Sequence, residues 1–156
     1  MDEIKLYLQR SENELVMAEI LYKISNEDES KNFFEIEDDF TFYNGVIAHS
    51  YYSIFYAAKA LLLMDGKKTS SPEVHKKTLD DFEKYLVKTG KLDLELLRIY
   101  KKMVVKADEL LNIFAEEKSK RGRFTYQKLP HANKQPAKDS LNNATNFFKN
   151  TNIILE

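Results

Sequence analysis

The residues best suited to chemistry gather in one basic stretch in the last third of the chain. Between Lys118 and Lys138 lie seven cations and no acid. His131 can exchange protons near neutral pH, and Arg123 can stabilise negative charge on a phosphate. Rings interleaved with cations are typical of single-stranded nucleic-acid binding, because the rings stack on bases while the cations contact phosphates. The candidates for phosphate or base contact in this stretch are Lys120, Arg121, Tyr126 and Lys128.

A plainer interpretation of this basic stretch stays open. The connector of residues 26–39 carries seven acids, and the cations could pair with it inside one chain or between two chains. Exposed pairs of this kind contribute under about 1 kcal/mol each. Phe33 and Phe34 interrupt the acids, and we expect them to anchor an otherwise exposed loop.

Lys59 is a second candidate for ligand contact. It follows Tyr52, Phe55 and Tyr56 within about two turns of an apolar helix, so its ammonium could meet a ligand phosphate. A lysine in such a place can instead extend its stem along the core and keep its ammonium in water. Both roles stay open.

Several classes of site are excluded or disfavoured by composition. The chain has no cysteine, which excludes disulfides, thiolate metal sites and cysteine nucleophiles. Its histidines, His49, His75 and His131, lie far apart, and the first two fall in expected helices, where we assign them structural roles. No glycine-rich phosphate loop is present. We therefore expect no metal and no cofactor.

The elements that position these residues are expected to be helices. Glycine and proline are scarce and fall at plausible breaks. The apolar spacing predicts five helices, at about residues 2–25, 42–64, 72–89, 94–119 and from 136 onward. Ser71 is a residue type that caps helix N-termini, and Pro72 would be the first helical residue after it. Asp93 can cap the next helix. The sequence predicts one domain over residues 1–156, an up-and-down all-α bundle of four to five helices.

The net charge, the apolar segment at 42–64 and the first residues of the chain bear on where the protein is located. The net charge of -1 requires any contact with nucleic acid to be local. The helix at 42–64 is apolar almost all round, and Lys59 inside it favours a buried central helix over a membrane span. The start at Met1 shows neither a basic nor an apolar leader, so we expect a cytoplasmic protein.

Three segments carry a resemblance to a known family. The run from Ala48 to Leu62, with its paired tyrosines, resembles the central helix of small stand-alone prokaryotic HEPN proteins. Phe82–Leu92 is similar to the third helix and turn of that family, and Arg121–Tyr126 falls where its Arg-x-x-Ala-Asp-Tyr motif would lie. The resemblance covers most of the chain from Ile4 to Phe148.

The resemblance implies a homodimer and a minimal nucleotidyltransferase as partner. Many HEPN proteins are metal-independent ribonucleases in which an arginine and a histidine, four to six residues apart, meet across a dimer. The nearest pair here is Arg123 and His131, whose seven intervening residues depart from that spacing. Two functions stay open: a module that binds a nucleotide or a nucleotidyltransferase, or an endoribonuclease acting as a toxin or defence effector on RNA.

Overall fold

The computed structural model of this chain describes residues 2–119 and 134–156, and every regular element within these two ranges is helical. The all-α fold class predicted from the sequence is therefore confirmed. The elements in chain order are α1 (Glu3–Asn26), α2 (Asp28–Phe33), α3 (Tyr43–Met64), α4 (Val74–Asp81), the π-helical segment η1 (Phe82–Val87), α5 (Leu94–Ser119) and α6 (Lys134–Leu155).

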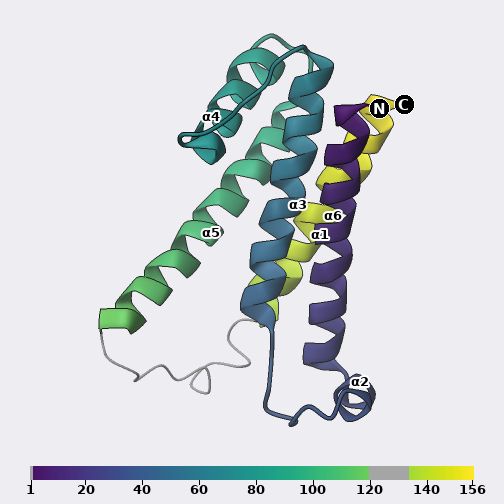
Figure 1. The fold of residues 1–156 in the computed structure, drawn as a ribbon, viewed down its shortest axis with the longest axis vertical. Helices are drawn as coiled ribbons and strands as arrows, with labels where there is room; N and C mark the ends of the chain where they lie inside the picture. The colour runs from purple at the N-terminus through teal and green to yellow at the C-terminus, as the bar shows by residue number, and fades with distance from the viewer. Residues whose placement is uncertain (1, 120–133) are drawn as a thin grey trace.

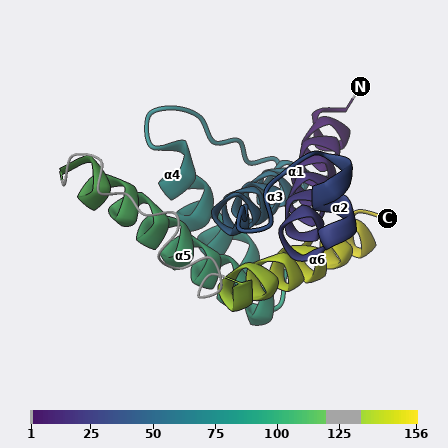
Figure 2. The same ribbon diagram turned by 90° about the horizontal axis from the view of Figure 1, so that it is seen from below.

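The four long helices form the bundle. Figure 1 shows α1 and α3 running side by side in opposite directions, with α4 beside the C-terminal half of α3. The short helix α2 lies at the other end of the α1–α3 pair. Seen from below in Figure 2, α6 lies against one side of this pair and α4 lies on a different side.

α3 is the central helix, as its nearly continuous apolar sequence predicts. It contacts α1, α4, α5 and α6, and Ile54 and Leu61 on it are fully buried. By length and composition α3 could cross a membrane, but 61% of its most apolar window is buried inside the fold. This burial favours the role of an interior helix of the bundle.

Small residues allow α1 and α3 to approach closely. The hydroxyl of Ser11 donates to the carbonyl oxygen of Ser53 at 2.7 Å, and both side chains are fully buried. At Gly45 an added Cβ would lie 2.9 Å from a terminal methyl of Leu21. The pair is thus joined by a buried hydrogen bond as well as by apolar contacts.

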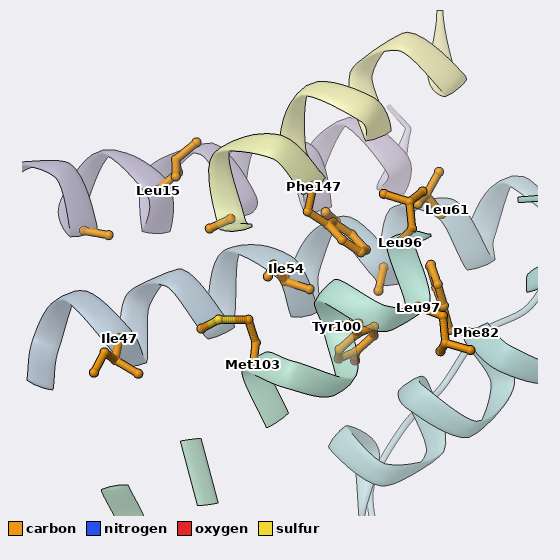
Figure 3. Packing of buried hydrophobic residues seen from close by; sticks show 14 of the residues in the cluster. Leu15, Ile47, Ile54, Leu61, Phe82, Leu96, Leu97, Tyr100, Met103 and Phe147 are labelled. Carbon is orange, nitrogen blue, oxygen red and sulfur yellow. The ribbon is translucent and has the colours of Figure 1, made fainter. Parts of the chain in front are cut away.

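Three aromatic side chains tie the remaining elements to α3. Phe82 of η1, Tyr100 of α5 and Phe147 of α6 are fully buried. Their ring centres are 5.6 to 6.1 Å apart, with tilted and edge-to-face geometry that favours such pairs. Figure 3 shows Phe147 projecting from α6 towards the α3–α5 side of the core, with Ile54 and Met103 nearby.

Helix ends largely follow the predicted signals. The carboxylate of Asp2 accepts from the amide of Ile4 at the start of α1, and that of Asp93 accepts from the amide of Glu95 at the start of α5. The predicted start of the fourth helix at 94 is confirmed, and α5 is helical up to Ser119, the last described residue of that range. α6 already includes Lys134, two residues before the predicted start at 136.

Two local predictions are wrong. The third helix begins at Val74 and not at Pro72. Glu73 has a left-handed backbone with φ of 55°, so it cannot be part of the right-handed helix that follows it. The acidic connector contains α2, and its phenylalanines do not anchor it: Phe33 is 80% exposed and Phe34 is 54% exposed. The buried side chain there is Lys31, whose ammonium donates to the carbonyl oxygen of Asp38.

Candidate ligand-binding cluster on the central helix

One of the predicted site residues, Lys59, lies within the described part of the chain. The others lie outside the described residues: Lys120, Arg121, Arg123, Tyr126, Lys128 and His131. The predicted roles of these six residues in phosphate binding, base contact or catalysis therefore stay predictions. The geometry of Lys59, in contrast, can be built up from its neighbours.

Lys59 is half-buried and its ammonium lies among rings. Its Nζ is 4.8 Å from the ring centre of Tyr7 on α1 and 5.6 Å from that of Phe55 on its own helix. It also donates to the carbonyl oxygen of Thr69, in the segment between α3 and α4, at 3.3 Å. Among the described residues, the side chain is held by cation–π contacts and one neutral acceptor, and none of these contacts neutralises its charge.

A second cation, Arg10 of α1, shares the ring of Tyr7 with Lys59. The guanidinium of Arg10 is 5.8 Å from the ring centre of Tyr7 and 5.7 Å from that of Tyr56. These two tyrosines, from α1 and α3, stack on each other at 6.2 Å. Within the described residues, neither Arg10 nor Lys59 lies within ion-pair distance of a carboxylate.

His75, at the start of α4, completes the cluster. Its ring stacks on Phe55 with 4.2 Å between ring centres and lies 5.7 Å from the ring of Tyr51 and 5.9 Å from that of Tyr52. Its Nδ1 is hydrogen-bonded to the phenol oxygen of Tyr51 at 2.9 Å. We call Tyr7, Arg10, Tyr52, Phe55, Tyr56, Lys59 and His75 the aromatic–cation cluster.

Burial and charge fix the protonation states in this region. Burial, together with the neighbouring ammonium of Lys59, lowers the pKa of His75 below its ordinary value. Burial raises the pKa of Tyr51 to about 12, helped by Tyr52 and by Asp108 on α5. At neutral pH the imidazole is therefore neutral and the phenol keeps its proton.

The sequence interpretation of His75 as a purely structural residue missed this arrangement. The i, i+4, i+7 spacing of Tyr52, Tyr56 and Lys59 does place them on one side of a helix. Nothing in the spacing, however, links that side to His75, because α4 folds back along α3 and begins beside Phe55. Arg10 was missed for the same reason, since its helix meets α3 only in the tertiary structure.

Other polar groups lie apart from this cluster. His49 of α3 contacts the carboxylate of Glu14 on α1 and so forms an interhelical pair. Among the described side chains, no three His, Asp or Glu residues gather as a metal site requires.

The aromatic–cation cluster, with its cations and rings, offers the binding of an anion and of a flat ring.

The comparisons with known proteins agree with the fold. The family model of the HEPN domain matches residues 18–154. A Methanocaldococcus jannaschii protein, described by its name as a putative toxin, is 39% identical over 94 residues. That match covers 60% of this chain and 51% of the relative, so the chain spans about half the length of the relative. No solved structure matches the chain significantly.

Proposed function

This chain belongs to the HEPN domain family, and from that premise we propose that it is the toxin-like member of a nucleic-acid-linked system. In this proposal it binds a nucleotide or a minimal nucleotidyltransferase partner. The name of the M. jannaschii relative supports the toxin-like part. The location that we propose is the cytoplasm, where such partners occur.

The observation that carries the binding proposal is the aromatic–cation cluster. Arg10 and Lys59 are cations held on rings without a carboxylate partner among the described residues. Positive charge that is fixed in place and not neutralised attracts phosphates, and neighbouring rings suit bases. The seven cations between Lys118 and Lys138 add a second, sequence-based source of the same attraction.

The experiment measures binding of labelled RNA, nucleotide and a candidate nucleotidyltransferase at several salt concentrations. We expect affinity to fall as salt rises, since charge neutralisation drives the contact. The double substitution of Arg121 and Arg123 by alanine should weaken binding to RNA or to the partner by about tenfold. Lys23→Ala, which removes a cation of α1 that pairs with Glu27, is the control and should change little. Salt-independent affinity, or none for any of these ligands, would contradict the proposal.

A second candidate function is metal-independent endoribonuclease activity, favoured by the toxin name of the relative. In this function His131 would move protons and Arg123 would support the charge on the phosphorane, across a homodimer. In such cleavage the RNA 2′-hydroxyl loses its proton and attacks the phosphorus, and the P–O5′ bond breaks. The products are a 2′,3′-cyclic phosphate end and a protonated 5′-hydroxyl end.

The cleavage prediction is tested by comparing the wild type with a variant that lacks the His131 imidazole. Purified protein and its His131→Ala variant are incubated with mixed RNA in the presence of a chelator. We expect 2′,3′-cyclic phosphate ends from the wild type and a loss of at least about a hundredfold in the variant, the low end for removing a general acid–base group. Equal cleavage by both proteins would exclude His131, and no cleavage by either folded dimer would leave the binding function alone.

A further inference from the structure

The aromatic–cation cluster combines buried rings with a set of polar side chains, which we call its rim. Tyr7 and Phe55 are the buried rings, 8% and 5% exposed. Arg10 and His75 are exposed and Lys59 is half-buried. These three side chains come from α1, α4 and α3, so the rim exists only when the three helices are packed together.

The two cations of the rim contact the same ring, that of Tyr7. Both the guanidinium of Arg10 and the ammonium of Lys59 lie within 6 Å of the centre of the Tyr7 ring, at 5.8 and 4.8 Å. Their contact with rings restricts their motion without cancelling their charge. An anion that meets both therefore gains two charge-assisted hydrogen bonds from donors that are already ordered.

His75 can add a third donor. The phenol of Tyr51 keeps its proton, because its pKa is raised to about 12, and it can donate that proton to Nδ1 of the neutral imidazole. In that tautomer the hydrogen of the imidazole is on Nε2, which the Tyr51 contact does not use. Nε2 then serves as a donor to a ligand oxygen.

Tyr52 offers a surface for a ring. Its side chain is 40% exposed, although the neighbouring Phe55 is buried, and it meets His75 edge to face at 5.9 Å. A base can stack on such an exposed ring whatever its identity, since each base has a π face. The cluster thus combines phosphate donors with a stacking surface on the same side of α3.

We propose that the aromatic–cation cluster is a nucleotide-binding site, in which Arg10, Lys59 and His75 hold the phosphate and Tyr52 stacks on the base. This inference rests on the proposed function and deepens it, because it assigns a site and a ligand chemistry. The ligand is a base joined to a phosphate, either a free mononucleotide or part of an RNA strand. The four residues assigned to the site all lie within the described part of the chain.

The test is calorimetric titration of the full chain with AMP, adenosine, inorganic phosphate and a short adenine-only RNA. We expect AMP to bind more tightly than adenosine or phosphate alone. Arg10→Gln and Lys59→Gln should each weaken AMP binding by about tenfold, which corresponds to about 1.4 kcal/mol. Lys59→Arg should retain most of the affinity, and Lys149→Gln on α6 is the matched control with unchanged binding.

Two further variants separate the parts of the site. Tyr52→Ala should weaken AMP binding while leaving binding of inorganic phosphate unchanged, and His75→Gln should weaken both. Tighter binding of AMP than of the RNA indicates a free nucleotide as the ligand, and the reverse order indicates a strand. Either order supports the site, provided that the cluster variants lower the affinity.

The outcomes distinguish this inference from the proposed function. If AMP or RNA binds and the affinity is lost in the Arg121/Arg123 variant but kept in all cluster variants, the site is wrong, and the proposed function then rests on the basic stretch at 118–138 alone. If none of the four ligands binds, the site is wrong, and the proposed function then depends on the nucleotidyltransferase measurement. Equal affinity for AMP and inorganic phosphate would also overturn the nucleotide assignment.

Discussion

His75 is an imidazole held partly away from water, with a cation as neighbour. Its ring packs on Phe55 and its Nδ1 meets Tyr51, while Lys59 lies close enough to disfavour a second positive charge. Asp108 of α5 acts on Tyr51, the hydrogen-bond partner of His75. The surroundings of a single residue thus set which form of the imidazole the folded protein contains.

This environment predicts a pH dependence of stability. Burial, helped by Lys59, lowers the pKa of His75 in the folded state below 6.5, its ordinary value. The unfolded chain therefore binds more protons between the two pKa values, and the free energy of unfolding should fall as pH drops through that window. We expect urea denaturation to show this fall, and His75→Gln to reduce it. A nuclear magnetic resonance titration of His75 gives the pKa directly.

Lys59 provides the control for that titration. Lys59→Gln removes the neighbouring charge and should move the pKa of His75 back towards its ordinary value, whereas Lys23→Gln should leave it unchanged. A His75 pKa above 6.5 in the wild type would contradict the described geometry. A pKa that stays the same in the Lys59 variant would assign the whole effect to burial.

At the scale of elements, the packing of α5 leaves one polar group unsatisfied. Tyr100 is fully buried, and within the described residues its hydroxyl has no hydrogen-bond partner. Burial raises the pKa of Tyr100 well above its ordinary value, so the phenol stays neutral. An unsatisfied buried hydroxyl costs about 1–3 kcal/mol, while the ring itself contributes contacts with Phe82 and Phe147.

Tyr100→Phe is therefore expected to stabilise the protein. The substitution keeps the ring and removes the unsatisfied hydroxyl, so the free energy of unfolding should rise by about 1 kcal/mol in chemical denaturation. Tyr43→Phe is the matched control, because the Tyr43 hydroxyl donates to Asn26 at 2.6 Å and its loss should destabilise by a similar amount. Destabilisation by both substitutions would indicate a hydrogen bond at Tyr100.

At the scale of the whole molecule, membership of the HEPN family motivates a homodimer as our proposal. The described residues add one observation: α1 carries four apolar side chains that are 39–45% exposed. A second copy of the chain would bury such side chains and gain about 25 cal/mol for each Å² removed from water. The four residues are Leu6, Val16, Met17 and Ile20.

Light scattering at micromolar concentrations checks the dimer. We expect twice the chain mass of 18.3 kDa, with dissociation on dilution into the nanomolar range. Val16→Lys together with Ile20→Lys, both on the exposed side of α1, should lower the mass towards that of one chain while the circular dichroism stays helical. A single-chain mass at all concentrations would remove both the dimer and a composite nuclease site.

The sequence by itself determined the helical class, the central position of α3 and the start of α5. These features follow from local periodicity and capping, because the apolar spacing of 42–64 and the cap at Asp93 each depend only on residues that are close in sequence. It did not determine the start of α4 or the exposure of Phe33 and Phe34, because these depend on a left-handed Glu73 and on how the connector meets α1 and α3.

The aromatic–cation cluster shows the same division. Lys59 and its neighbouring rings were predicted from α3 alone, because residues three and four apart share one side of a helix. Arg10 and His75 joined them only through tertiary packing, which brings together residues about 50 and 16 positions away from Lys59. Local sequence patterns carry no information about which side of one helix meets another, and packing of the whole core decides that contact.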